Sequence, residues 1–129
     1  MPTRKAGAQW DGTLKGGKGS FKAESGLGGA YSFGTRFESG SGSNPEELIA
    51  AAHAACYSMA LAGGLEKAGA TPESVETDAQ CTVEKVGEGF KITTMRLSCR
   101  AKASGIDAEK FRQVAEATKH GCPVSGALA

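Results

Sequence analysis

The sequence predicts an α+β fold in which short antiparallel strands surround one long buried helix. The 19 glycines concentrate before residue 43, which favours turn-rich strands in the N-terminal third. Residues 44–69 form one Ala-rich helical segment, and two alternating runs and a shorter helical segment follow it. Because the strands come in runs apart from the helices, an α+β arrangement is favoured over a parallel α/β sheet.

The segment of residues 44–69 has clear helical ends. Asn44 can accept a hydrogen bond from a free N–H of the first turn, and Pro45 suits the first helical position. Glu46 and Glu47 place negative charge at the positive end of the helix dipole, and Gly69 can end the helix. Its apolar residues cover nearly the whole circumference, which is typical of a buried helix. Cys56 lies near its middle.

The N-terminal third is predicted to form three strands. Residues 8–15 and 19–25 make a hairpin around the glycine-rich residues 16–18. After a loop at residues 26–30, residues 31–38 alternate strictly, with Tyr31, Phe33, Thr35 and Phe37 on one side. This alternation predicts a half-buried strand that carries Arg36 on its other face.

A second hairpin is expected after the long helix. Residues 75–84 alternate, residues 87–89 form a turn, and the apolar phase of residues 90–103 changes near Thr93 and Thr94, which suggests a bulge. A turn at Glu88 would place Cys81 opposite Met95 and Cys99 opposite Thr77. Asp107 then caps a helix that ends at Gly121, and Cys122-Pro123 opens a final helical turn.

Composition narrows the class of protein. The 129 residues fit a single domain, residues 1–129, and the net charge of +1 makes a nucleic-acid partner a poor expectation. No uninterrupted apolar run of about 18 residues is present, so no membrane association is expected. No secretory signal is visible, and we expect a cytoplasmic protein.

Two small sheets and a helix that is apolar all round do not close a core within one chain of this size. A second copy could cover the remaining face of the helix, so the sequence predicts a homodimer. A chain of 129 residues can bury a real core, although length alone does not fix the number of domains.

The four cysteines differ in context. Cys81 and Cys99 lie on the apolar phase of strands, which favours plain core packing. Cys56 is either another small core residue or a reactive thiol. In the second case it needs a neighbouring cation, because a mid-helix position does not lower its pKa. Cys122 stands at a helix N-terminus, where exposed N–H groups favour a thiolate.

A metal site is an alternative use of these cysteines. His53 and Cys56 are three residues apart on one helical face, and His120 with Cys122 supplies a second nitrogen–sulfur pair. Together the four could bind zinc tetrahedrally, although neither pair has a familiar zinc-knuckle spacing. The simpler interpretation makes His53 a hydrogen-bonded helix histidine and His120 a charged partner of a helix C-terminus.

Two stretches, TRFESGSGSNPEELIAAAHAACYSMAL (residues 35–61) and KHGCPVSGAL (residues 119–128), resemble the osmotically inducible protein C (OsmC) family. This family belongs to the superfamily of organic hydroperoxide resistance (Ohr) thiol peroxidases. The resemblance implies an OsmC-like fold, with an intertwined homodimer and antiparallel or mixed sheets around the central helix. It also implies that the chain continues for about a dozen residues past Ala129 into a last strand that completes a sheet, so this sequence is either truncated or leaves that sheet edge open.

The resemblance implies roles for four residues. Cys56 would be the peroxidatic cysteine and Cys122 the resolving cysteine, Arg36 would activate thiolate and peroxide, and Glu46 would hold Arg36. The substrates implied are organic hydroperoxides, and hydrogen peroxide less efficiently, in defence against oxidative and osmotic stress. A dithiol such as a lipoylated protein or dihydrolipoamide would be the reductant, with no cofactor. A non-catalytic stress protein is the competing hypothesis.

The spacing of Glu46 and Cys56 constrains this site. Ten residues separate them, which is about 15 Å along a straight helix. An arginine held by Glu46 therefore cannot reach Cys56 of the same straight helix. Either the partner chain supplies one of these residues or the helix bends sharply, and we expect an active site shared between the two chains of a dimer.

Overall fold

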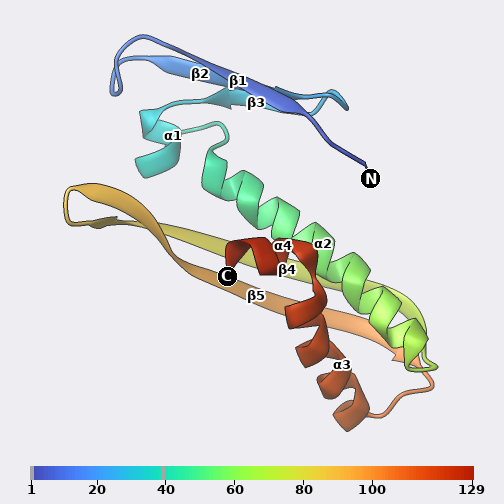
Figure 1. Cartoon of the computed structure of the whole chain (residues 1–129). Helices are drawn as coiled ribbons and strands as arrows, with labels where there is room; N and C mark the ends of the chain where they lie inside the picture. Colours follow the sequence, from blue (N-terminus) through green and yellow to red (C-terminus); the bar gives the residue numbers. More distant parts are fainter. Residues whose placement is uncertain (1, 39) are drawn as a thin grey trace. The chain divides into compact units, whose positions relative to one another are not determined.

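The structure is a computed structural model that describes residues 2–38 and 40–129. It confirms the α+β class and divides into two compact units, one ending at Leu48 and one beginning at Ile49. Within the described residues the elements are β1 (Ala6–Asp11), β2 (Lys18–Ala23), β3 (Gly28–Tyr31), α1 (Phe33–Phe37), α2 (Pro45–Lys67), β4 (Thr71–Val86), β5 (Gly89–Ser104), α3 (Ala108–Gly121) and α4 (Pro123–Leu128) (Figure 1).

The first unit contains an antiparallel sheet in the order β1-β2-β3. The predicted hairpin is confirmed, although its strands are shorter and its turn begins earlier than expected. Gly19 sits opposite both Trp10 and Tyr31. A Cβ at this position would lie 2.6 Å from the Tyr31 ring and 2.7 Å from the Trp10 ring, so the two aromatic rings depend on a glycine between them.

The predicted strand over residues 31–38 is wrong. The strand ends at Tyr31, and α1 begins at Phe33. Ser32 and Thr35 form a capping box, in which the Thr35 N–H donates to Ser32 Oγ (3.2 Å) and the Ser32 N–H donates to Thr35 Oγ1 (2.7 Å). These local hydrogen bonds favour a helix start over continued strand pairing. Arg36 therefore lies on a short helix rather than on a strand face.

Helix α2 begins as predicted. The Glu47 N–H donates to Asn44 Oδ1 at 2.7 Å, and Asn44 Nδ2 donates to the Thr35 carbonyl at 2.8 Å, which ties the start of α2 to α1. The helix ends at Lys67, and Gly69 follows with a φ of +88° in the left-handed region.

Burial of α2 is one-sided, which corrects the expectation of a helix buried all round. Leu61 and Leu65 are fully buried, whereas Met59 is 75% exposed. The exposed positions near Met59 are all small: Ala51, Ala52, Ala55 and Gly63. Helix α2 is long and apolar enough to span a membrane, with a mean hydropathy of 1.5 over its most apolar 18 residues. Core helices of soluble proteins meet the same criteria. Of these 18 residues, 22% are buried within the chain.

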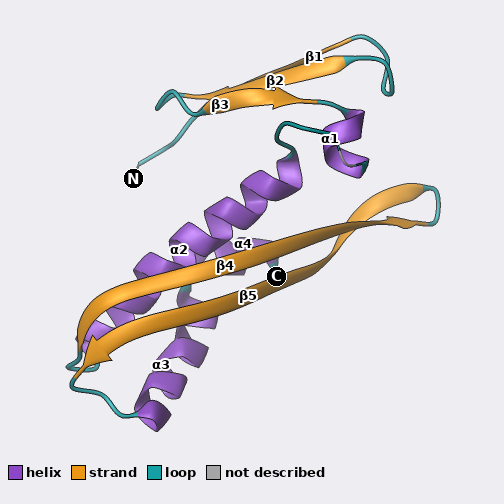
Figure 2. Cartoon of the chain, turned by 180° about the vertical axis from the view of Figure 1, so that it is seen from behind, coloured by secondary structure: helices purple, strands orange, loops and turns teal. Residues whose placement is uncertain are grey.

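The second unit is built on the antiparallel β4–β5 hairpin, with helices on one face of it (Figure 2). Both strands extend beyond the predicted ranges. The predicted register is confirmed, because Cys81 pairs with Met95 and Cys99 with Thr77. The predicted bulge is confirmed too: the register shifts between Thr82 and Val83 and leaves Thr93 as the extra residue.

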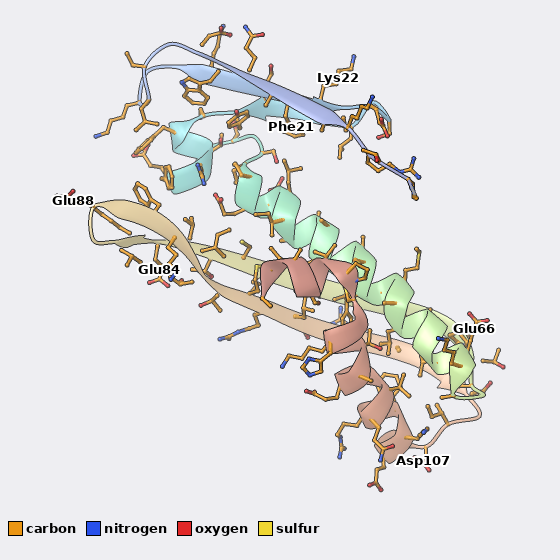
Figure 3. The ribbon with its side chains drawn as sticks, viewed as in Figure 1. Phe21, Lys22, Glu66, Glu84, Glu88 and Asp107 are labelled. Carbon is orange, nitrogen blue, oxygen red and sulfur yellow. The ribbon has the colours of Figure 1, made fainter. Side chains whose placement is uncertain are left out.

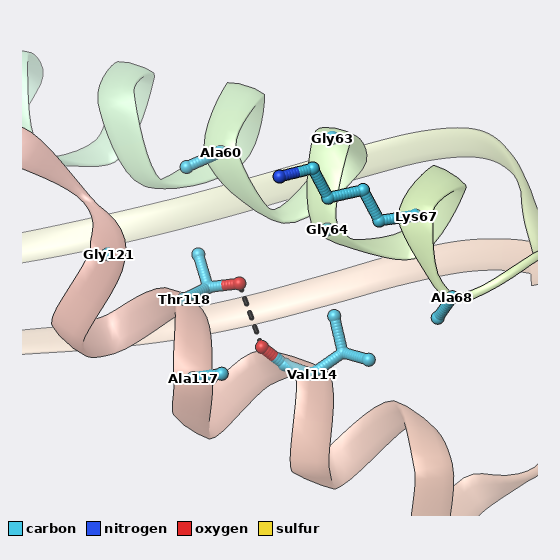
Figure 4. A pocket seen from close by; sticks show the side chains of 9 residues that line it. All are labelled: Ala60, Gly63, Gly64, Lys67, Ala68, Val114, Ala117, Thr118 and Gly121. Carbon is cyan, nitrogen blue, oxygen red and sulfur yellow. Dashed lines mark hydrogen bonds between the residues drawn. The ribbon is translucent and has the colours of Figure 1, made fainter.

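The last two helices also follow the prediction. Asp107 lies at the start of α3 (Figure 3), and its Oδ1 accepts from the Lys110 N–H at 2.7 Å. Helices α2 and α3 line a groove that is rich in small residues, among them Ala60, Gly64 and Ala117 (Figure 4). In this groove Thr118 Oγ1 donates to the Val114 carbonyl at 2.8 Å. A Cβ on Gly64 would meet Val114 Cγ1 at 3.0 Å, so this glycine sets the spacing.

Replacement of the α2 cap tests this account of the helix start. Asn44→Ala removes the side-chain acceptor for the Glu47 N–H and is expected to lower the free energy of unfolding by about 1 kcal/mol. Asn44→Asp keeps the acceptor and should retain most of that stability, losing only the bond to Thr35. Urea unfolding measures both variants, and equal stability of wild type and Asn44→Ala would contradict the assignment.

Candidate active site

Two cysteines from distant parts of the sequence meet in the second unit. Cys56 lies in the middle of α2, and Cys122 is the N-cap of α4 directly after α3. Their sulfur atoms are 2.9 Å apart, and both are free thiols. The Cys122 N–H donates to the Thr118 carbonyl at 2.9 Å, which fixes the junction between the two helices. The pair is therefore held at a separation from which a disulfide needs only a small closing movement.

The two thiols differ in access. Cys122 is fully buried, whereas Cys56 is only partly buried. A molecule that arrives from solvent can reach Cys56 but not Cys122. Any first reaction with an external oxidant is thus expected at Cys56.

Their electrostatics differ as well. The hydrogen bond with Cys122 raises the pKa of Cys56, and burial raises it further. A hydrogen bond from the Val124 N–H lowers the pKa, but by less. Burial opposes ionisation of Cys122, but its hydrogen bonds with Cys56, with Ser125 and with the Val124 N–H together lower its pKa. Without a nearby cation, the first thiolate of the pair is therefore favoured on Cys122.

The first unit contains an ion pair between α1 and the start of α2. Arg36 Nε donates to Glu46 Oε1 at 2.9 Å, and Arg36 Nη2 donates to Glu46 Oε2 at 3.1 Å. The Glu46 side chain is 7% exposed and that of Arg36 is 38% exposed. This two-point contact orients the guanidinium while leaving part of it open. Arg36 of α1 thus pairs with Glu46 of α2.

An aromatic cavity of about 160 Å³ lies beside Arg36. The guanidinium lies over the Phe37 ring, 4.9 Å from its centroid, and the Phe33 and Phe37 rings are 5.1 Å apart. The remaining walls of the cavity come from the sheet and its connections: Trp10, Leu14, Tyr31 and Ser32. The cavity therefore combines an apolar lining with one cation.

The structure brings the four predicted site residues together as two pairs, Cys56 with Cys122 and Arg36 with Glu46. Each pair lies within one unit. The catalytic roles of these residues remain predictions.

The alternative zinc quartet is not assembled. No group of three or more His, Cys, Asp or Glu side chains lies at metal-binding distance within the described part of the chain. His53 Nε2 instead lies 2.7 Å from Ser125 Oγ, and His120 is exposed on the last turn of α3.

Sequence reasoning missed Ser125. This residue contacts both His53 and Cys122. Its position three residues after Cys122, in the first turn of α4, was the available signal. The sequence alone suggests only two roles for His53, a metal ligand or a hydrogen-bonded helix histidine.

Comparison with known proteins gives the family. The sequence profile of the OsmC-like protein family matches residues 38–129. The chain is 48% identical over 127 residues to peroxiredoxin OsmC of Escherichia coli strain K12, a match that spans 97% of this chain and 89% of the relative.

Solved structures show the same fold. An OsmC-like protein of unknown function from Vibrio cholerae superposes with a TM-score of 0.72 at 15% identity, over 98% of this chain and 94% of the other. The organic hydroperoxide resistance protein OhrB of Bacillus subtilis superposes with a TM-score of 0.69 at 24% identity, over 95% and 89%.

The family match and the curated relative agree with the pair of adjacent thiols in the structure. The chain belongs to the OsmC-like family and is a thiol peroxidase.

Proposed function

We propose that this protein reduces organic hydroperoxides through a Cys56 sulfenic acid and a Cys56–Cys122 disulfide. The observation that carries this proposal is the sulfur pair itself, with one accessible and one buried thiol 2.9 Å apart. An accessible thiol can react with the peroxide, and a buried neighbour can then protect it from further oxidation.

The reaction follows in three balanced steps. The Cys56 thiolate attacks one peroxide oxygen, an S–O bond forms as the O–O bond breaks, and the departing alkoxide takes a proton to become the alcohol. The Cys122 thiolate then attacks the sulfur of the sulfenic acid, and the leaving hydroxide takes a proton to become water. A dithiol finally reduces the disulfide by exchange and closes its own disulfide.

Cys56 needs a cation to react as a thiolate. The second unit supplies none to it, since only Cys122, Val124 and burial shift its pKa. Arg36 remains charged at any working pH and is already oriented by Glu46. Glu46 and Cys56 are ten residues apart on one continuous helix, about 15 Å. We therefore assign the activating Arg36–Glu46 pair to a second copy of the chain.

A homodimer also accounts for the open side of α2. The exposed positions around Met59 are apolar or small, and a helix face of this kind is usually covered by a partner. One arrangement of two chains would then cover this face and complete two sites.

The cavity beside Arg36 favours organic over inorganic peroxide. Its aromatic walls can bury an alkyl or aryl group, and its cation can bind the peroxide oxygens. Hydrogen peroxide carries no apolar group and gains nothing from these walls. The cytoplasm, where dithiol carriers such as lipoylated proteins are kept reduced, is the proposed location.

Substitution of each cysteine tests the reaction. Cys56→Ser is expected to abolish reduction of cumene hydroperoxide with dihydrolipoamide as reductant, because the attacking sulfur is gone. Without added dithiol, Cys122→Ser should consume about one equivalent of peroxide and stop at a Cys56 sulfenic acid, because no resolving thiol lies beside Cys56 to form the disulfide. Mass spectrometry after dimedone trapping detects this state. Cys81→Ser serves as control and should turn over normally. Multiple turnover by Cys56→Ser would rule out the mechanism.

Truncation of the cavity wall tests the substrate class. Phe33→Ala removes an aromatic wall and should lower kcat/KM for cumene hydroperoxide by about tenfold. This factor corresponds to the loss of about 1.4 kcal/mol of apolar contact with the substrate. It should leave kcat/KM for hydrogen peroxide within about twofold of wild type. Leu27→Ala, an exposed residue outside the cavity, is the matched control. Equal losses for both peroxides would refute a role of the cavity in selectivity.

A further inference from the structure

His53 is a buried histidine that the proposed reaction does not use. It is 6% exposed, and its Nε2 lies 2.7 Å from Ser125 Oγ. Its other ring nitrogen, Nδ1, is buried without a hydrogen-bond partner among the described residues. His53 is three residues before Cys56 on α2, so the two side chains share one helical face.

Ser125 connects this histidine to the sulfur pair. Its hydroxyl hydrogen-bonds the Cys122 side chain. Ser125 is held in place from the other side by His53, and α4 itself is held by the bond from the Gly126 N–H to the Cys122 carbonyl at 3.0 Å. A continuous chain of contacts therefore runs from His53 through Ser125 to Cys122 and on to Cys56.

We propose that His53 and Ser125 are positioning residues that hold Cys122 as a thiolate for the disulfide-forming step. This inference rests on the proposed function and goes beyond it, because it assigns two residues that stabilise the thiolate of the resolving cysteine, Cys122.

The unpartnered Nδ1 sets the direction of the hydrogen bonds. A ring that carries one hydrogen leaves no buried N–H without an acceptor only when that hydrogen is on Nε2, so we assign it there. Nε2–H then donates to Ser125 Oγ, which frees the Ser125 hydroxyl hydrogen for the Cys122 sulfur. In the other tautomer the hydroxyl would donate to His53, and Cys122 would lose this donor.

The direction of these hydrogen bonds affects the formation of the Cys56–Cys122 disulfide. Cys122 attacks the sulfenic sulfur of Cys56 as a thiolate, and the proton that it has lost is matched by the one that the released hydroxide takes up. The S–S bond forms, the S–O bond breaks, and the hydroxide released takes a proton from solvent. Donors that stabilise the thiolate raise the fraction of Cys122 able to attack at neutral pH.

The other hydrogen bonds that lower the pKa of Cys122 come from Cys56 and from the Val124 N–H. The titratable side chains close to Cys122 are Cys56 and Tyr57 of α2, and β5 contributes Cys99 next to Tyr57. The Tyr57 hydroxyl is engaged with the Ala115 carbonyl at 3.0 Å. Lys119 and His120 at the end of α3 are exposed, and Glu116 of α3 lies close enough to Tyr57 to raise the pKa of its hydroxyl.

The pH dependence of disulfide formation tests the proposal. In single-turnover experiments with cumene hydroperoxide, acid quenching and mass spectrometry follow the Cys56 sulfenic acid and the Cys56–Cys122 disulfide separately. Ser125→Ala should move the pH midpoint of the second step upward by about one unit, the value of one hydrogen bond to a charged group. The rate of sulfenic acid formation should stay within about twofold of wild type.

Variants of His53 provide the second arm, which decides the matter even if Ser125→Ala does not fold. His53→Leu removes the donor and should shift the midpoint in the same direction, whereas His53→Gln restores a donor near Nε2 and should return it toward wild type. Ser58→Ala, which removes a hydroxyl bonded to Thr77 at 2.7 Å, is the control and should cause no shift.

The outcomes separate the two proposals. If the wild type forms the disulfide but Ser125→Ala and His53→Leu keep its midpoint, the positioning role is refuted and the proposed function stands. If the wild type forms a sulfenic acid that never becomes a disulfide, the proposed function itself is refuted. Equal midpoints for His53→Leu and His53→Gln would also refute the role of the Nε2 donor.

Discussion

The contact between Cys56 and Cys122 is the constraint on which the second unit depends. To bring the two sulfurs to 2.9 Å, α3 must end at Gly121 so that Cys122 can turn the chain into α4 against the middle of α2. The buried residues Tyr57, Leu61 and Leu65 surround the same region, so the hydrophobic core and the reactive pair are one packed structure. A change that loosens this core is therefore expected to separate the sulfurs as well.

Most of the fold could be predicted from local sequence signals. Asn44-Pro45 and Asp107 mark helix starts by their capping chemistry, and the phase change near Thr93 marks the bulge. The strand predicted from Tyr31 to Glu38 was wrong. Its residues alternate as in a strand, but the hydrogen bonds between Ser32 and Thr35 form a capping box that starts a helix instead. The burial of α2 was overestimated because apolar composition does not say which side of a helix is covered within the chain.

The site was predictable in its members but not in its geometry. The motifs around Arg36, Cys56 and Cys122 pointed to thiol chemistry, yet no spacing rule places residues 66 positions apart at sulfur–sulfur contact. The link from His53 through Ser125 was missed for the same reason, since it joins α2 to a helix at the other end of the chain. Such contacts follow from tertiary packing, which periodicity does not encode.

The central claim is that each active site combines the cysteines of one chain with the Arg36 of its partner. Co-expression of Cys56→Ser and Arg36→Ala chains with different tags, followed by purification of the mixed dimer, tests it most directly. In a twofold dimer with shared sites, one site of the mixed dimer carries both substitutions and the other carries neither, so about half of the wild-type peroxidase activity should return. A mixed dimer as inactive as either parent would contradict the account.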